Sequence, residues 1–174
     1  MNIIPRRREY HGPTPAGGTA ILPYGRKEIE MKVRDLMSTN ITCVKEDASV
    51  SQIASHMKRD DVGCLPVCDD AGHLKGIITD RDLVLRALTE KQPGETTSGD
   101  IMTTSPVTVS PDMNIHDAAL LFSAHQIRRL PVIEASRIVG MLSLGDVAAK
   151  PVCIDEAGDA LSAISVTGAA PAES

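Results

Sequence analysis

The sequence predicts an α+β protein built from two copies of one β-α-β-β-α unit, stacked with pseudo-two-fold symmetry. Three observations favour this fold class. The chain repeats itself at an offset of 65 residues, each copy alternates short strand-like runs with amphipathic helical stretches, and each places Gly, a hydroxyl residue and Asp at one spacing. A unit of ~50 residues is too small to bury a sheet face alone, so two stacked copies are expected to share their burial.

The internal repeat is visible at matched positions along the two copies. At an offset of 65, Met37 aligns with Met102, and Leu65-Pro66-Val67 aligns with Leu130-Pro131-Val132. After a one-residue difference in a turn, the motif Gly-x-x-[Thr/Ser]-x-x-Asp follows in both copies. Its members are Gly76, Thr79 and Asp82 in the first copy and Gly140, Ser143 and Asp146 in the second.

The elements of each copy follow in the same order. A short strand (ITCV; VTVS) comes first, and an amphipathic helix follows because apolar residues recur at i, i+3, i+4 and i+7. A strand ending in LPV, a polar turn, a further strand (LKGII; RIVGML) and a final helix (DLVLRAL; GDVAAK) complete the unit. The helical stripes are Val50, Ile53, Ala54 and Met57 in the first copy, and Ile115, Ala118, Ala119 and Phe122 in the second.

Composition divides the chain into five expected segments. Residues 1–32, rich in Gly, Pro and charge, are predicted to be a flexible arm, and the polar residues 93–98 a linker between the copies at 33–92 and 99–150. Residues 151–174 form a tail. Its stretch EAGDALSAIS has a weak helical stripe, Ala157, Leu161 and Ile164, for which docking on the body, docking on a partner and disorder all stay open.

The overall composition limits the function classes. Of the 174 residues, 42% are hydrophobic but only 2% aromatic, so the core must be aliphatic, helped by seven Met. The net charge is −5, and the first 32 residues hold six Lys/Arg against three Asp/Glu, so the remaining chain is distinctly acidic. An acidic body is a poor surface for nucleic acid. No stretch approaches the ~20 apolar residues of a membrane span, and a cytoplasmic protein is expected.

The cysteines and histidines do not predict a metal site. Cys43, Cys64, Cys68 and Cys153 lack CxxC spacing, and the five His are scattered. Cys43 and Cys68 lie on predicted strands of one copy that could be neighbours in its sheet. Buried thiols are the simpler interpretation of this pair, and a redox-formed disulfide is the alternative.

The stretch Thr79-Asp80-Arg81-Asp82 has two interpretations. A hydroxyl followed three residues later by an acid is a capping box, and Ser143 with Asp146 would form the same box in the second copy. The alternative is a ligand site, because a helix start after a strand offers free N–H groups. Arg81 inside the first junction, and Arg128 and Arg129 before the second LPV strand, would supply cations suited to phosphate oxygens.

Taken with the doubled motif, the stretches LPVCDDAGHLKGIITDRD and HQIRRLPVIEASRIVGMLSLGD resemble a tandem pair of cystathionine-β-synthase (CBS) domains. The resemblance covers about Val33 to Ala149 and is closest to small free-standing bacterial CBS-pair proteins linked to stress and hypoxia responses. It implies that an adenosine ligand binds in the clefts between the two units.

The resemblance also implies roles for individual residues. Asp82 and Asp146 would accept hydrogen bonds from ribose hydroxyls, and Thr79 and Ser143 would help to hold ribose or phosphate. Arg129, with Arg128, matches the basic position that meets phosphate, whereas the first copy has Gly63 and Cys64 there, so the two sites are not equivalent. The adenine would lie near Thr42 and Leu65, or near Val107 and Leu130.

We therefore expect a non-catalytic regulatory module and sensor that binds an adenine nucleotide such as AMP, ADP or ATP and requires no cofactor or metal. A homodimer is expected, and the output would be dimer geometry or an unknown effector protein, with no nucleic-acid or membrane partner. Two alternatives remain open: a structural or interaction module with vestigial clefts, and a redox-responsive protein using Cys43 and Cys68. The sequence leaves open which adenosine ligand binds, NAD(H) and S-adenosylmethionine included.

Overall fold

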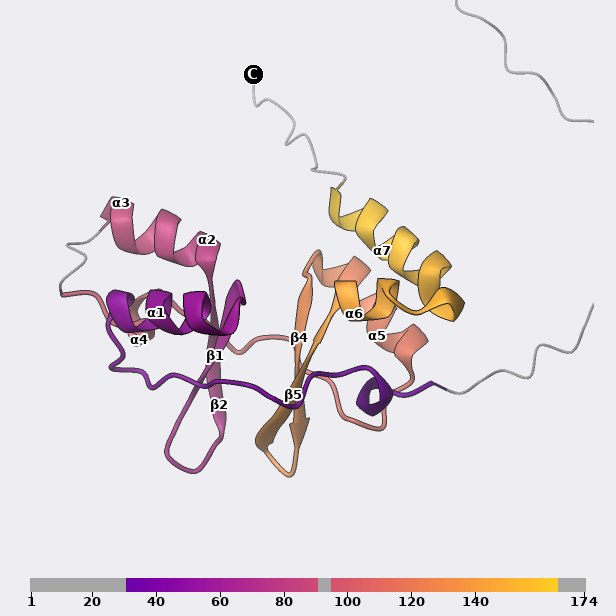
Figure 1. Cartoon of the computed structure of the whole chain (residues 1–174), viewed down its shortest axis with the longest axis horizontal. Helices are drawn as coiled ribbons and strands as arrows, with labels where there is room; N and C mark the ends of the chain where they lie inside the picture. The colour runs from indigo at the N-terminus through magenta and orange to yellow at the C-terminus, as the bar shows by residue number, and fades with distance from the viewer. Residues whose placement is uncertain (1–30, 91–94, 166–174) are drawn as a thin grey trace, which may run out of the picture.

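The computed structural model describes residues 31–90 and 95–165 of the chain. These residues form two α+β units whose sheets lie next to each other at the centre, with helices on the two outer sides (Figure 1). Residues 1–30 of the predicted arm and the predicted linker position at Pro93-Gly94 lie outside the described residues.

The first copy follows the predicted order of elements. A 3₁₀ turn and helix α1 precede a β-hairpin, and a helical run at residues 80–90 ends the unit, with a π-helical segment in its middle. The elements are η1 (Val33–Asp35), α1 (Val50–Asp60), β1 (Cys64–Cys68), β2 (Leu74–Thr79), α2 (Asp80–Asp82), η2 (Leu83–Ala87) and α3 (Leu88–Glu90).

The second copy repeats this order and adds a C-terminal helix. Its elements are α4 (Ser98–Ile101), β3 (Thr103–Thr104), α5 (Ile115–His125), β4 (Arg129–Glu134), β5 (Arg137–Ser143), α6 (Leu144–Ala148), η3 (Pro151–Cys153) and α7 (Ile154–Ser165). The predicted initial strands, ITCV and VTVS, are not continuous strands in the structure. Each is reduced to one parallel bridge, Val44 to Val67 and Val109 to Val132, because each segment meets a neighbour at a single point.

The long helices begin and end where the sequence chemistry allows. The Ser49 side chain accepts a hydrogen bond from the Gln52 N–H at the start of α1, and Asn114 accepts one from the His116 N–H at the start of α5. Asp61 and Gln126, both with left-handed backbone, end the two helices at equivalent positions.

The predicted apolar stripes are realised unequally. All four stripe residues of α5 are buried, whereas in α1 only Ile53 and Met57 are buried and Ala54 is exposed. The stripe of α1 is therefore narrower than its sequence pattern indicates, because less of the protein packs over this helix.

The two hairpins pair in the same register. Leu65 faces Ile78 in β1 and β2, and the equivalent Leu130 faces Leu142 in β4 and β5. Each hairpin has an irregularity at the same place, after Val67 and after Val132. The internal repeat of the sequence is thus a repeat of backbone geometry.

The first segment of each copy pairs with the sheet of the other copy. Strand β3 adds to β2 of the first copy, while Ser38 bridges to Met141 in β5 of the second. Both exchanges run past a glycine: a Cβ on Gly76 would lie 2.7 Å from the Met102 sulfur, and one on Gly140 would lie 2.9 Å from the Met37 sulfur. Only glycine permits this close approach.

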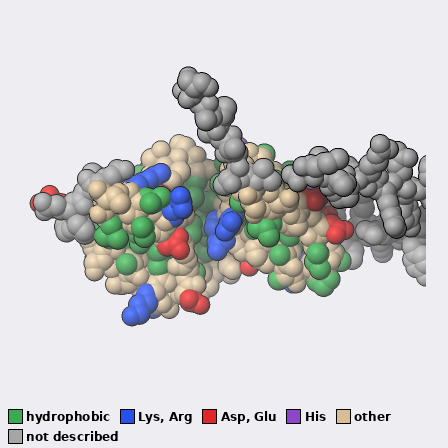
Figure 2. All heavy atoms as spheres, turned by 90° about the horizontal axis from the view of Figure 1, so that it is seen from above, with side chains coloured by type: hydrophobic (Ala, Val, Ile, Leu, Met, Phe, Trp, Pro, Cys, Tyr) green, Lys and Arg blue, Asp and Glu red, His purple; other side chains and the backbone are tan. Residues whose placement is uncertain are grey.

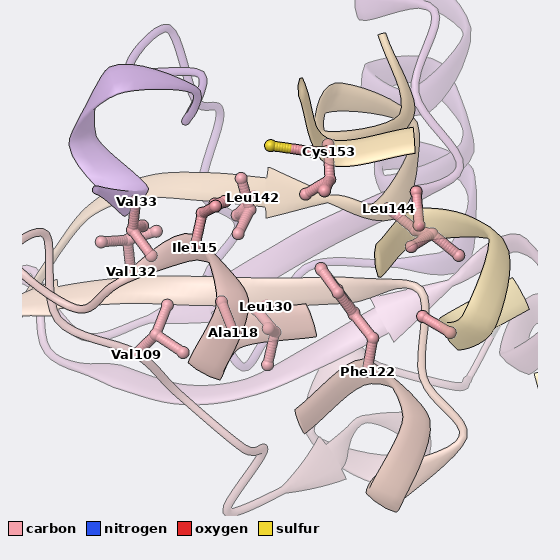
Figure 3. Packing of buried hydrophobic residues seen from close by; sticks show 13 residues of the cluster. Val33, Val109, Ile115, Ala118, Phe122, Leu130, Val132, Leu142, Leu144 and Cys153 are labelled. Atoms are coloured by element: carbon pink, nitrogen blue, oxygen red, sulfur yellow. The ribbon is translucent and has the colours of Figure 1, made fainter. Parts of the chain in front are cut away.

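The two cores are correspondingly interleaved. Val33, from the start of the first copy, is fully buried in the core of the second, beside Val132 and Ile115 (Figure 3). Ile101, from the start of the second copy, is buried in the core of the first. Each unit therefore supplies a buried segment to the core of the other.

Part of the predicted tail is an ordered element. Helix α7 packs against α5 and α6 of the second copy (Figure 1). Ala157 and Ala160 are buried there and Ile164 packs beside them, while Leu161 is 48% exposed, so the predicted stripe was wrong at Leu161. Within residues 31–90 and 95–165, no helix is long and apolar enough to cross a bilayer.

Candidate ligand-binding cleft

A cleft of about 750 Å³ opens between the two copies. On the face seen in Figure 2, Lys and Arg side chains gather close to the boundary between the two halves. A cavity of this size lies within the range found for small-molecule sites. Its lining from the first copy includes Asn40, Ile41, Thr42, Arg59, Asp60, Asp61, Val62, Cys64 and Leu65, and from the second copy Arg129, Met141, Ser143 and Asp146.

The wall from the second copy is the junction between β5 and α6. One carboxylate oxygen of Asp146, Oδ2, accepts hydrogen bonds from the Ser143 hydroxyl at 2.6 Å and the Ser143 N–H at 2.8 Å, while the Asp146 N–H donates to Ser143 Oγ at 3.1 Å. This is a complete capping box. The other oxygen, Oδ1, accepts no hydrogen bond from the described part of the chain, so it can receive one from a ligand.

The equivalent junction of the first copy has the same box but a different neighbour. Asp82 Oδ2 accepts from the Thr79 hydroxyl at 2.7 Å and from the Thr79 N–H at 2.8 Å. Asp82 Oδ1, however, lies 3.5 Å from Arg86 Nε, and Arg86 also donates to the Ile101 carbonyl at 2.7 Å. The capping interpretation therefore holds at both junctions, and in the second copy the junction also lines the cleft.

The wall from the first copy includes a polar group that the sequence analysis missed. Arg59 donates to Thr42 Oγ1 at 3.3 Å and to both carboxylate oxygens of Asp60, at 2.7 and 2.9 Å. Hydrogen bonds from Arg59 and Thr42 lower the pKa of Asp60 to about 2. Asp60 and Asp61 close α1, so a polar helix end before an LPV strand was the available signal.

The basic side of the cleft is Arg129. Its neighbour across the cleft is Cys64, which occupies the equivalent position in the first copy. Burial raises the pKa of the Cys64 thiol to about 11, against the opposing pull of the Arg129 charge. A neutral thiol leaves the Arg129 guanidinium as the cation at this point of the lining, available to an anionic group of a ligand.

The structure places the predicted site residues in two groups. Thr42, Leu65, Arg129, Ser143 and Asp146 line this cleft, so the site joins residues from both copies. The other predicted residues lie outside its lining. Thr79 and Asp82 form the first capping box, Arg81 and Arg128 are exposed, Leu130 is fully buried in the second core, and Val107 is half-buried against it.

Among residues 31–90 and 95–165, no group of three or more His, Cys, Asp or Glu side chains could hold a metal ion. The cleft lining combines hydroxyl side chains, the guanidinium groups of Arg59 and Arg129, the carboxylates of Asp60, Asp61 and Asp146, and apolar residues such as Leu65. This combination suits a ligand with a flat ring, a diol and an anionic group.

Comparison with known proteins agrees with this arrangement. The sequence profile of the CBS domain matches residues 33–88 and 99–158. The chain is a tandem CBS-domain pair. The CBS domain-containing protein YhcV of Bacillus subtilis is 39% identical over 133 residues, which cover 76% of this chain and 94% of YhcV.

Solved CBS-pair structures share the fold. CBSX2 of Arabidopsis thaliana, in complex with AMP, matches with a TM-score of 0.62 and 34% identity over 71% of this chain and 98% of CBSX2. The CBS-domain pair of protein MJ0100, in complex with 5′-methylthioadenosine and S-adenosyl-L-methionine, matches with a TM-score of 0.63 and 27% identity, over 68% and 94% of the two chains. Both of those pairs therefore hold adenosine-containing molecules.

Proposed function

We propose that this CBS pair is a regulatory module that binds an adenosine ligand of the AMP, ADP or ATP type in the cleft between its two copies. One observation carries the proposal. Ser143, Asp146 and Arg129 of the second copy line the same cleft as Thr42 and Leu65 of the first copy. The adenosine ligands of the two solved relatives support the same chemical class.

Each part of such a ligand has a proposed partner. Ribose hydroxyls are donors, and Asp146 Oδ1 is an acceptor left free by the capping box in the described residues. The adenine ring would lie against Leu65, with Thr42 at its edge. Arg129 would pair with a phosphate, since guanidinium donors form charge-assisted hydrogen bonds to phosphate oxygens.

The matched variants Asp146→Ala and Asp82→Ala test the proposal. Calorimetric titration of the full chain with adenosine, AMP, ADP, ATP, NAD and S-adenosylmethionine identifies the ligand. Asp146→Ala is expected to weaken binding at this cleft by more than about tenfold, or ~1.4 kcal/mol. Asp82→Ala removes the equivalent cap but no lining group, and should leave that affinity unchanged.

Thermal unfolding separates binding from a vestigial cleft. A ligand present at a hundred times its Kd adds ~2.7 kcal/mol to the unfolding free energy. If no member of the panel stabilises the wild-type chain, the cleft is vestigial and the chain is a structural or interaction module.

The proposed output is a change in the geometry of a homodimer. Val84, Leu85 and Leu88, on the helical run that ends the first copy, are 54%, 45% and 60% exposed. Apolar side chains grouped on one helix are typical of an interface. Light scattering on the wild type and on Leu88→Glu tests this. The wild type should have twice the mass of the variant. If the wild type and the variant are both monomeric, the homodimer is excluded and the output would pass through a separate effector protein.

A further inference from the structure

Two cysteines of the first copy lie in contact with each other. The Cys68 thiol donates to Cys43 Sγ across 3.1 Å. Cys43 is exposed, whereas Cys68 is 3% exposed. Their backbones are fixed relative to each other, because the Val44 N–H donates to the Pro66 carbonyl and the Cys68 N–H donates to the Val44 carbonyl. The two sulfur atoms therefore meet because of the fold.

The contact makes the two thiols chemically different. The hydrogen bond from Cys68, with help from the Lys45 charge and against partial burial, lowers the pKa of Cys43 to about 7. The same contact, together with burial and the neighbouring Asp69, raises the pKa of Cys68. An exposed thiol with thiolate character is the nucleophile in disulfide exchange, and a buried protonated neighbour can resolve the product.

We propose that Cys43 and Cys68 form a redox-active dithiol that takes a low-molecular-weight disulfide as its oxidant. The Cys43 thiolate attacks one sulfur of the small disulfide, which forms a mixed disulfide and releases one thiolate. Cys68 gives its proton to that thiolate and attacks the Cys43 sulfur, which displaces the second small thiolate. The two cysteines lose two electrons, and one small disulfide becomes two small thiols once the second thiolate takes up a proton.

Closing this bond requires only a small movement. The sulfur atoms must approach from 3.1 Å to the ~2.05 Å of a disulfide. The second copy has Thr108 and Ile133 at the equivalent positions, so the dithiol belongs to the first copy alone.

The dithiol is linked to the cleft through Thr42. Ile41 and Thr42 line the cleft directly before Cys43, and the backbone around them is held by single bridges at Ser38 and Val44. A disulfide would fix this segment to β1 before a ligand arrives, so less conformational freedom would be lost on binding. The oxidised chain should therefore bind AMP more tightly, a consequence that rests on the proposed function.

The first experiment does not need a ligand. The full chain is incubated with oxidised glutathione, and intact mass and peptide mapping are followed over time. The wild type should lose the mass of two hydrogen atoms and yield a Cys43–Cys68 peptide, and so should the matched control Cys64→Ser/Cys153→Ser. Cys68→Ala should stop at glutathione on Cys43, and Cys43→Ser should react at neither position. A cross-link through Cys64 or Cys153, or a Cys68→Ala variant that behaves like the wild type, would overturn the proposal.

The second experiment measures AMP affinity by calorimetry in the reduced and oxidised forms. Oxidation should tighten binding about three- to tenfold, the scale of pre-ordering one side chain or short segment at the site, and a reductant should reverse it. Cys68→Ala should show no such response. Equal affinities in the two forms would overturn the link to the cleft. If AMP binds neither form, the proposed function fails. The dithiol proposal is still tested by the peptide mapping of the first experiment, which needs no ligand.

Discussion

The two copies share one scaffold but present different side chains on it. The hydrogen bonds of the two capping boxes differ by no more than 0.1 Å, and the hairpins pair in one register. Yet Arg129 stands where the first copy has Cys64, and the thiols Cys43 and Cys68 have no counterpart in the second. Caps and strand pairing conserve the backbone geometry of the repeat, whereas the positions that line the cleft are free to differ.

The copies also differ in what covers their helices. Helix α7 lies over the second copy and adds Ala157 and Ala160 to its core. In the described residues nothing equivalent covers the first copy, whose Leu88 is 60% exposed. The helices of the second copy are thus more completely buried, whereas the helical run that ends the first copy leaves apolar side chains exposed.

The largest expected effect tests this difference in burial. Phe122 and Met57 occupy equivalent positions in α5 and α1, and Phe122 is fully buried while Met57 is 7% exposed. Phe122→Ala should lower the unfolding free energy by about 3–5 kcal/mol, and Met57→Ala should cost less within the ~2–5 kcal/mol range of such truncations. Urea unfolding followed by circular dichroism measures both, and a larger cost at Met57 would reverse the comparison.

Glycine substitutions test the exchange of segments between the copies. Gly76→Ala and Gly140→Ala should each destabilise the chain by ~1–3 kcal/mol, because the new Cβ would meet a methionine sulfur and a backbone carbonyl. Gly158→Ala in α7 is the control. It meets nothing within 4 Å and should stabilise its helix by ~0.5–1 kcal/mol. The same unfolding assay applies, and neutral substitutions at Gly76 and Gly140 would show that the exchanged segments are held loosely.

The basic lining tests the asymmetry of the cleft. Arg129→Ala should weaken AMP binding about tenfold, or ~1.4 kcal/mol, and adenosine binding much less, since adenosine has no phosphate. Arg128→Ala is the matched control, because Arg128 is exposed outside the lining. Calorimetry with both ligands gives the ratio. Equal losses of affinity for adenosine and AMP would show that Arg129 supports the folded structure and does not bind the phosphate.

The capping boxes test what the copies have in common. Thr79→Ala and Ser143→Ala should each lower the unfolding free energy by ~1 kcal/mol, because each removes the hydroxyl that accepts from a helix N–H. Ser162→Ala, at an exposed position of α7, should stay within ~0.5 kcal/mol of the wild type. Clearly unequal costs at Thr79 and Ser143 would show that one box is supported by other contacts.

The smallest expected effect is a change in the alkylation rate of Cys43, with no change in the unfolding free energy of the chain. Alkylation of Cys43 by iodoacetamide should accelerate as pH rises through about 7, because the lowered pKa converts the thiol to thiolate there, whereas Cys64, with a pKa of about 11, should stay slow. The hydrogen bond from Cys68 and, to a smaller extent, the charge of Lys45 lower the pKa of Cys43. Cys68→Ala removes the donated hydrogen bond and should move the Cys43 transition to higher pH. An unchanged profile would assign the shift to Lys45 alone.

Much of the fold follows from local sequence. The repeat, the order of strands and helices and the two capping boxes depend on residues close together in the chain, so their pattern could be recognised directly. Two expectations failed for reasons outside the local pattern. Ala54 is exposed because little of the protein covers α1, and Leu161 is exposed because α7 turns Ala160 toward α5 and α6.

The sequence by itself determined the duplicated unit, the capping residues and the chemical types available to a ligand, because each depends on spacing within one copy. Only the tertiary structure decided which residues meet. It joined Thr42 and Leu65 to Ser143 and Asp146, moved Val33 into the core of the opposite copy, and placed Cys43 against Cys68. The physical reason is that each copy completes its core and its sheet with a segment of the other, and no pattern within one copy records what lies across that contact.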